Sequence, residues 1–193
     1  MDGDTAEDEI LIVVVSDGAG SASRAETGSR LACCSLLEII RIHMCHGLRV
    51  DQIGPETARD WMLTIRSQLE TKASEEGVSI RDYACTLLAV IAGPKSAAFL
   101  QLGDGAMVVN EGEKGWRYVF WPQKGEFANA TYFVTQEDMD VRFSFERIEH
   151  RVDELAVFTD GIEPLVLRYA DKSVHAPYFN EMFSTVRSFA HEG

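Results

Sequence analysis

The sequence has little positive charge and no segment in which Lys and Arg gather. It contains 18 Lys and Arg residues against 31 Asp and Glu residues, which gives a formal net charge of −13 at pH 7. Binding to nucleic acid or to an anionic membrane surface depends on clustered Lys and Arg side chains that neutralise phosphate charge. We therefore expect neither nucleic acid nor a membrane among the partners of this protein.

Cysteine and long apolar runs are also scarce. The four cysteines have no C-x-x-C spacing, so they predict neither a zinc site nor a disulfide framework, and a reducing compartment is the default. The first nine residues are acidic where a signal peptide is basic, and the apolar run after them is too short to cross a bilayer. We expect a cytoplasmic protein that is not exported.

The length and composition predict one domain. With 193 residues, of which 46% are hydrophobic, the chain can bury one sizeable core but is too short for two. The sequence has no internal repeat or low-complexity tract. We expect residues 1–193 to form a single domain in which residues 1–9 are flexible.

The pattern of apolar residues predicts an α+β fold. Continuous or alternating apolar runs indicate strands, and apolar residues at helical spacing indicate helices. A serine within residues 21–23 is expected to cap the first helix, with Glu26 downstream. Many short strands joined by turns favour antiparallel pairing, and hence a β-sandwich with helices on its outer faces. Strands are expected at residues 10–16, 83–92, 97–102, 106–110, 116–121, 132–135, 142–148 and 154–159, and helices at residues 21–46, 55–77, 161–169 and 177–190.

Three Asp-Gly dipeptides each follow an expected strand: Asp17-Gly18, Asp104-Gly105 and Asp160-Gly161. A single Asp-Gly is usually only a turn, but three copies at strand ends of one sandwich can converge on one cleft. Glycine has no side chain, so its backbone carbonyl can approach a cation closely. Carboxylate, carbonyl and water oxygens are ligands of Mg²⁺ and Mn²⁺, and no Cys or His cluster indicates zinc. The dipeptides therefore predict a site for one of these cations.

The same residues resemble the ordered motifs of the metal-dependent protein phosphatase 2C family. The order of the motifs, the long helix after the first and the hairpin between the second and third agree with that family. Residues 125–133 also resemble a segment of a bacterial subgroup, which favours Asp-Gly-x-Gly-Ser in the first motif. The other matching segments are residues 14–21 (VVSDGAGS), 85–88 (CTLL), 102–105 (LGDG) and 157–161 (VFTDG).

This resemblance implies an αββα sandwich and hydrolysis of phosphoserine or phosphothreonine in a phosphorylated protein, in a signalling role. It implies that Asp17 bridges two metal ions, that the Gly18 carbonyl binds one of them, and that Asp160 binds the other. Asp17 and Asp160 are then the expected catalytic residues, and Asp104 would join Asp160 at a third, weaker metal position. A water held by two cations loses a proton more easily and attacks phosphorus in line, while the cations stabilise the phosphoryl oxygens.

The sequence departs from the family pattern at both ends. The family has an earlier strand with a phosphate-binding Arg and an acidic pair, which Glu7 and Asp8 match only in type. It also has a closing Asp-Asn or Asp-Asp motif, which is not found before Gly193, and many relatives carry a histidine where this chain has Ala19. We expect one or two metal ligands to be missing from this chain, through truncation at both ends or through loss of the motifs.

These departures keep a second function open. A phosphatase-like module with an impaired metal site would bind a phosphorylated partner without hydrolysing it. Other interpretations are weaker, because residues 18–20 lack the third glycine and the following parallel strand of a dinucleotide-binding loop. Cys85 lies in an apolar strand without a nearby activating histidine, which argues against a nucleophilic thiol. Arg24 lies close to the first motif, but an ordinary exposed arginine is a simpler interpretation than a phosphate ligand.

Overall fold

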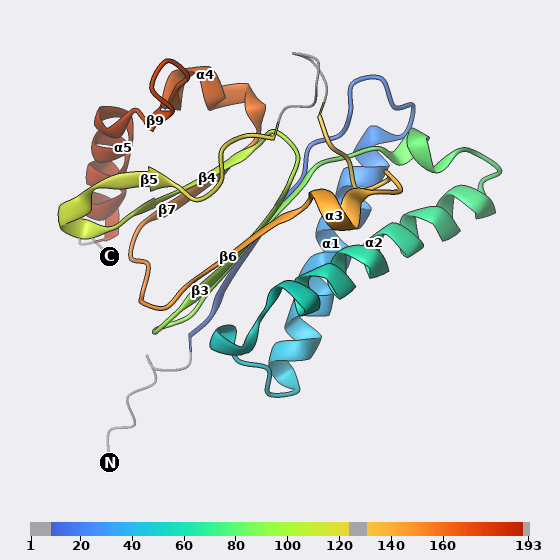
Figure 1. The fold of residues 1–193 in the computed structure, drawn as a ribbon, viewed down its shortest axis with the longest axis horizontal. Coiled ribbons are helices and arrows are strands. Elements are labelled where there is room, and N and C mark those ends of the chain that lie inside the picture. The colour runs from blue at the N-terminus through green and yellow to red at the C-terminus, as the bar shows by residue number, and fades with distance from the viewer. Residues whose placement is uncertain (1–8, 124–130, 191–193) are drawn as a thin grey trace.

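The computed structural model describes residues 9–123 and 131–190, which form two antiparallel sheets between two layers of helix (Figure 1). The strands are β1 (Leu11–Val15), β2 (Leu87–Ala92), β3 (Ala97–Leu102), β4 (Ala106–Asn110), β5 (Trp116–Tyr118), β6 (Ser144–Ile148), β7 (Leu155–Phe158), β8 (Leu167–Arg168) and β9 (Ser173–Val174). The α-helices are α1 (Ala25–Cys45), α2 (Pro55–Glu75), α3 (Met139–Arg142), α4 (Glu163–Val166) and α5 (Ala176–Ala190). Short 3₁₀ turns lie at Val50–Gln52, Ile80–Tyr83, Gly112–Lys114 and Asp160–Ile162.

The two sheets confirm the predicted antiparallel pairing. The first sheet has the strand order β1-β2-β3-β6, and the second has the order β5-β4-β7. Every pairing within them is antiparallel, as is the small ribbon of β8 and β9. Some of these pairs are hairpins, such as β2 with β3, and others join strands that lie far apart in the chain, such as β1 with β2.

The apolar residues form three cores, one between each pair of neighbouring layers. Leu87 and Ala89 of β2 pack toward α1 and α2, whereas Leu88 and Val90 of the same strand face the second sheet. A third core, which includes Phe179, lies between the second sheet and α5. Because β2 has a core on both faces, each of its positions is apolar and buried. The layers therefore follow the order α-β-β-α, which confirms the predicted sandwich.

Helix α1 begins without the serine cap that the sequence predicts. Its N-cap is Arg24, which makes no side-chain cap hydrogen bond. The Ser23 hydroxyl donates instead to Asp82 Oδ1 at 2.8 Å, so it contributes to a tertiary contact rather than to the helix end. The serine-cap prediction is therefore wrong. At the other end, Gly47 with a φ of +92° ends the helix as expected, because glycine tolerates this left-handed conformation.

Two expected strands are shortened or absent. The strand expected over residues 83–92 starts only at Leu87, because Ile80–Tyr83 form a 3₁₀ turn. Cys85 makes only an isolated bridge to Gly18, which continues the register of β1 and β2. Residues 132–135 form no strand, and the Val134 N–H donates to the Cys85 carbonyl at 2.9 Å. The β-branched and aromatic side chains of residues 132–135 predicted a strand, but this segment is held by tertiary contacts instead.

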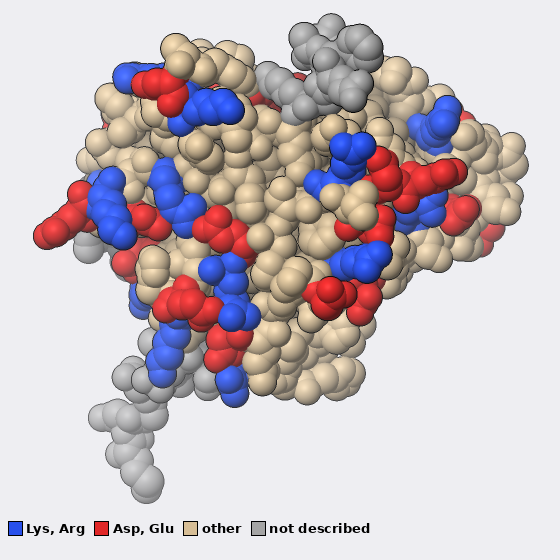
Figure 2. All heavy atoms as spheres, in the orientation of Figure 1, with Lys and Arg blue, Asp and Glu red and all other residues tan. Residues whose placement is uncertain are grey.

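Other elements are shorter than the sequence predicts. The helix expected over residues 161–169 ends at Val166, because β8 then pairs with β9. The strands expected at residues 116–121 and 142–148 are reduced to β5 and β6, and α3 precedes β6. Arg117 of β5 joins the two sheets by donating to Glu146 of β6 at 2.6 Å. Figure 2 shows the same neighbourhood of opposite charges over one face of the protein, where Lys and Arg side chains lie next to Asp and Glu side chains.

Within residues 9–123 and 131–190, no helix combines the length and the apolar character that crossing a membrane requires.

Candidate functional site

The three predicted carboxylates each lie shortly after the end of a strand of the sandwich. Asp17 follows β1, Asp104 lies in the turn between β3 and β4, and Asp160 follows β7. Strand β2 lies between β1 and β3, and β4 pairs directly with β7, which places Ala106 opposite Phe158. Strand β2 thus connects the strand end that carries Asp17 to β3, and β4 connects the turn that carries Asp104 to the strand end that carries Asp160.

Thr86, just before β2, holds the first dipeptide. The Asp17 N–H donates to Thr86 Oγ1 at 2.9 Å, and the Thr86 N–H donates to the Asp17 carbonyl at 2.8 Å. The Ser16 hydroxyl donates to the Thr86 carbonyl at 2.5 Å. The Asp17 carboxylate is exposed and, within the described part of the chain, makes no hydrogen bond or ion pair. Its backbone is therefore fixed while its side chain is available to a cation.

Gly18 occupies a position that has no room for a side chain. A Cβ added there would lie 2.7 Å from the Cβ of Ala25 and 2.8 Å from the carbonyl carbon and oxygen of that residue. The N–H of the next residue, Ala19, donates to the Ala84 carbonyl at 2.9 Å. Gly18 is thus enclosed between the first turn of α1 and the segment before β2, which explains the need for glycine.

Polar side chains hold the turn that carries Asp104. Gly103, with a φ of +113°, donates its N–H to Gln123 Oε1 at 2.9 Å. The amide nitrogen of Gln123 donates to the Arg142 carbonyl at 2.8 Å. Asp104 Oδ2 accepts a hydrogen bond from the Thr131 hydroxyl. Gln123 therefore orients the turn, and Thr131 orients the carboxylate.

The Asp160 dipeptide lies in more open surroundings. Asp160 is exposed at the start of a 3₁₀ turn, and Thr159 at the N-cap makes no side-chain cap hydrogen bond. Among the described residues, nothing lies within 4 Å of the position that a Cβ would take on Gly161. By contrast, a Cβ on Gly105 would lie 2.7 Å from the carbonyl oxygen of Phe158. Strand β7 is thus closely packed, but the dipeptide beyond it is not.

The structure connects the strand ends without gathering their carboxylates into one cluster. Thr86 contacts both Asp17 and Gly103, because a Cβ on Gly103 would lie 2.5 Å from its methyl group. Nevertheless, no three His, Cys, Asp or Glu side chains within residues 9–123 and 131–190 are placed so that they could hold a metal ion. The side chains of the described residues thus do not by themselves supply a complete set of metal ligands.

The donors that are present fit Mg²⁺ or Mn²⁺. Asp17 offers an exposed carboxylate, and the Gly18 carbonyl lies next to it in the chain. Mg²⁺ usually keeps several water ligands and takes only one or two carboxylates from a protein. An all-oxygen site of this kind therefore does not require three carboxylates from the described residues, and it is the type of site that hard divalent cations prefer.

The structure does not favour Cys85 as a nucleophile or Arg24 as a phosphate ligand. Cys85 is buried, and burial raises the pKa of its thiol to about 12, so little reactive thiolate forms at neutral pH. Arg24 Nε donates to Glu76 Oε2 at 2.7 Å. Hydrogen bonds from Arg24 and Lys72 lower the pKa of Glu76 to about 2. Arg24 is therefore engaged in an ion pair between the helices.

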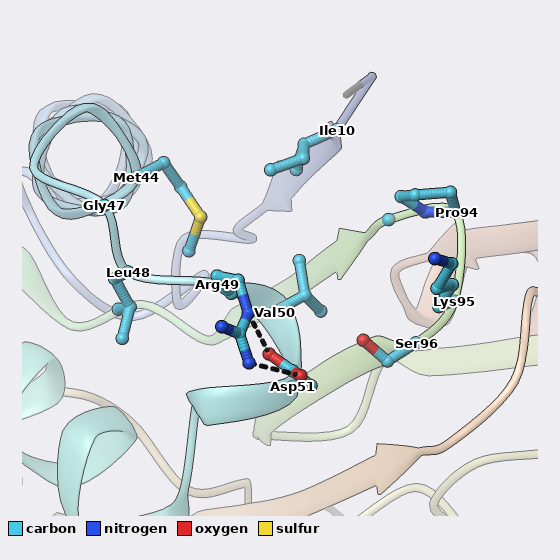
Figure 3. Close-up of a pocket in the computed structure, with 11 residues that line it drawn as sticks. Ile10, Met44, Gly47, Leu48, Arg49, Val50, Asp51, Pro94, Lys95 and Ser96 are labelled. Atoms are coloured by element: carbon cyan, nitrogen blue, oxygen red, sulfur yellow. Dashed lines mark hydrogen bonds and ion pairs between the residues drawn. The ribbon is translucent and has the colours of Figure 1, made fainter. Parts of the chain in front are cut away.

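A recess of about 540 Å³ lies at the other end of the first sheet (Figure 3). It is lined by Met44 near the end of α1, by Ile10 before β1, and by the turn between β2 and β3. Arg49 within it is paired with Asp51 at 2.8 Å. Strand β1 runs from this recess toward Asp17, so the recess is separate from the strand ends that carry the dipeptides.

A family model described as protein phosphatase 2C matches residues 3–191, which is nearly the whole chain. The chain belongs to the protein phosphatase 2C family. It is 35% identical over 185 residues to serine/threonine-protein phosphatase 3 of Escherichia coli (strain K12), and the match covers 95% of this chain and 71% of that relative. Membership makes the chain an enzyme of the phosphoprotein phosphatase class, which confirms the predicted family and enzyme class.

Solved structures share the phosphatase 2C-like sandwich. The serine/threonine phosphatase Stp1 from Staphylococcus aureus superimposes with a TM-score of 0.61 at 16% identity, over 84% of this chain and 69% of that one. PppA, described as a key regulatory component of T6SS in Pseudomonas aeruginosa, gives a TM-score of 0.57 at 19% identity, over 83% of this chain and 73% of that one. At such low identities the likeness concerns the fold alone.

The phosphatase 2C motifs include Thr86 and Thr131, but the resemblance assigned no role to either residue or to Gln123. Thr86 had one signal, because it is a polar residue in an otherwise apolar segment. Gln123 gave none, since its contacts depend on the folded turn. Thr131 belongs to residues 125–133, which resemble the bacterial subgroup, but residues 124–130 lie outside the described part of the chain.

Proposed function

We propose that this chain, as a single domain, hydrolyses phosphoserine or phosphothreonine in a phosphorylated protein, in a reaction that depends on Mg²⁺ or Mn²⁺. The observation that supports this most is the state of Asp17. Its backbone N–H and carbonyl are both hydrogen-bonded to Thr86, while its exposed carboxylate has no partner within the described residues. A carboxylate that is held in place but not neutralised favours the binding of a hard cation.

Each strand-end residue has a proposed role. Asp17 would be shared by two ions, the Gly18 carbonyl would help to hold one of them, and Asp160 would help to hold the other. Asp104 would join Asp160 in holding a third, weaker ion, and the hydrogen bond from Thr131 orients the Asp104 carboxylate. When bound, the ions would supply an activated water and stabilise charge on the phosphoryl oxygens.

The contribution of the chain itself is to hold these ligands before the substrate arrives. The hydrogen bonds to Thr86 fix the Asp17 backbone, so its carboxylate loses little conformational freedom on binding. The close packing of Gly18 against Ala25 limits movement of the adjacent peptide in the same way. Both features favour a site that is formed in advance of the reaction.

A regulatory module is the second candidate function. One observation favours it: within the described residues, no three potential metal-ligating side chains form a group. A site with few protein ligands would hold its cations weakly, and the domain would then bind a phosphorylated partner without hydrolysing it. A cytoplasmic signalling role is compatible with either function and stays a prediction.

The test of the proposed function is Mn²⁺-dependent hydrolysis of a phosphoserine peptide by the chain and by its Asp17→Asn and Asp160→Asn variants. We expect turnover that requires Mn²⁺ and falls in both variants. Asp153→Asn is a matched control, because Asp153 is an exposed carboxylate that pairs with Arg151 at 2.7 Å. Full turnover in Asp17→Asn would contradict the proposal, and peptide binding without turnover by the unaltered chain would favour the regulatory module.

A further inference from the structure

Thr86 is a polar residue buried at a position where its neighbours are apolar. It is only 3% exposed and lies between the buried residues Cys85 and Leu87. A buried hydroxyl needs hydrogen-bond partners, and Thr86 finds them on the backbone of Asp17. Valine would fill nearly the same volume without a polar group, so packing alone does not account for threonine.

We propose that Thr86 is a positioning residue that sets the placement of Asp17 and of Asp104 through two different groups. Its hydroxyl holds the backbone of Asp17, and its methyl group packs against Gly103, the residue before Asp104. The inference rests on the proposed function, because that function is what gives the two carboxylates their role. The contacts themselves belong to the protein without metal and can be measured there.

The hydroxyl acts on both polar backbone groups of Asp17. Thr86 Oγ1 accepts the Asp17 N–H at 2.9 Å and donates to the Asp17 carbonyl over 3.4 Å, so the bond that it accepts is the stronger one. The Thr86 N–H donates to the same carbonyl at 2.8 Å. Contacts at both the N–H and the carbonyl restrict φ and ψ of Asp17. They thereby restrict the direction of its carboxylate and of the following Gly18 carbonyl.

The methyl group acts on the turn that carries Asp104. A Cβ on Gly103 would lie 2.5 Å from the Thr86 methyl carbon and 2.7 Å from the Thr86 Cβ, so the Gly103 backbone rests against this side chain. Gly103 is also held by the hydrogen bond that its N–H donates to Gln123 at 2.9 Å. Removal of the methyl group would open space beside the turn without breaking the bonds to Asp17.

Two substitutions separate these roles. Thr86→Val keeps a methyl group against Gly103 and removes the hydroxyl, whereas Thr86→Ser keeps the hydroxyl and removes the methyl group. Thr71→Val is the matched control, because the exposed Thr71 hydroxyl donates only to the Ser67 carbonyl of its own helix at 2.9 Å. This control measures the general effect of replacing a threonine hydroxyl that makes no hydrogen bond to Asp17.

The experiment combines amide hydrogen exchange of the metal-free protein with calorimetric titration of Mn²⁺. In Thr86→Val, we expect faster exchange at the Asp17 amide and unchanged exchange at the Gly103 amide. We also expect the Mn²⁺ affinity to fall by about tenfold to a hundredfold, which is the usual effect of removing a group that orients a metal ligand. In Thr86→Ser, we expect faster exchange at Gly103, a protected Asp17 amide, and nearly unchanged Mn²⁺ affinity. Thr71→Val should match the unaltered chain in both measurements.

Three results would overturn the inference. The first is an unchanged Asp17 amide in Thr86→Val, and the second is an unchanged Gly103 amide in Thr86→Ser. The third is the same faster exchange at both amides in both variants, which would indicate general loosening of the fold. If Thr86→Val does not fold, Thr86→Ser still decides, because an unchanged Gly103 amide contradicts the role of the methyl group. Exchange without metal does not depend on catalysis, so full turnover in Asp17→Asn would refute the proposed function while leaving the exchange result intact.

Discussion

Asp17-Gly18 and Asp160-Gly161 share a sequence and a place after an apolar strand, but their surroundings differ. A Cβ on Gly18 would lie 2.7 Å from the Cβ of Ala25, whereas nothing in the described chain lies within 4 Å of that position on Gly161. The backbone of Asp17 is hydrogen-bonded to Thr86 at both its N–H and its carbonyl. The Asp17 end is therefore fixed in advance, whereas the space beside Gly161 is open.

This difference matches the roles proposed for the two carboxylates. A ligand that bridges two ions has to satisfy both at once, so it gains from being held in one geometry. A ligand of one ion can adjust its position when the ion binds. The same dipeptide can thus serve as a rigid or an adjustable ligand, depending on what packs around its glycine.

The largest expected effect is the loss of turnover in Asp17→Asn. Metal ions contribute several kcal/mol of transition-state stabilisation. Because Asp17 is proposed to hold both ions and Asp160 only one, we expect a loss of about a thousandfold in kcat/KM for Asp17→Asn, against about thirtyfold for Asp160→Asn. Steady-state kinetics with a phosphoserine peptide at fixed Mn²⁺ measure both. Equal losses in the two variants would show that the carboxylates do not differ in this way.

A smaller effect is expected when the two glycines are replaced. Gly18→Ala would force a Cβ against the backbone of α1, so we expect a loss of about 1–3 kcal/mol in the free energy of unfolding. Gly161→Ala meets open space and should change that free energy by less than about 0.5 kcal/mol. Urea unfolding of the two variants checks the contrast directly. The predicted difference is contradicted if Gly18→Ala has the same free energy of unfolding as Gly161→Ala.

The smallest effect concerns the ion pair behind the Asp17 end. Hydrogen bonds from Arg24 and Lys72 hold the pKa of Glu76 at about 2, below its ordinary value of 4.5. This stabilisation is complete above about pH 4.5 and is lost as the pH falls toward 2, because protons then bind the unfolded chain first. Glu76→Gln should therefore be less stable than the unaltered chain at about pH 6 and closer to it at about pH 3.

Urea unfolding at the two pH values measures this difference. Glu75→Gln is the matched control, because Glu75 is an exposed neighbour of the same type. The control should show no such pH dependence relative to the unaltered chain. Identical behaviour of the two variants would mean that the ion pair does not stabilise the start of α1.

The sequence predicted the elements whose apolar pattern is long or strong. Helix α1, helix α2 and the strands β1, β3 and β4 lie where periodicity placed them. The errors fall where long-range contacts override local preference. Val134 was expected in a strand but donates to Cys85, and Leu167 was expected in a helix but pairs with Val174. Such pairings leave no local mark in the sequence.

The candidate site likewise contains residues that a local motif predicted and residues that only long-range contacts identify. Asp17, Asp104 and Asp160 were predicted as metal ligands because each stands in an Asp-Gly dipeptide at the end of an apolar run, and their role stays a prediction. Thr86 and Gln123 were not found as site residues, since the hydrogen bonds that give them a role span 69 and 20 positions of the chain. Motifs thus indicate candidate cation ligands, and only the fold shows which residues hold those candidates in place.

The central claim is that Asp17 is the carboxylate on which cation binding depends, and calorimetric titration of Mn²⁺ tests it most directly. Because the Asp17 carboxylate makes no hydrogen bond or ion pair within the described residues, Asp17→Asn should fold as the unaltered chain does. We predict that Mn²⁺ binds the unaltered chain and that its affinity falls by at least about a hundredfold in Asp17→Asn. Equal Mn²⁺ affinity for the two proteins would contradict the account.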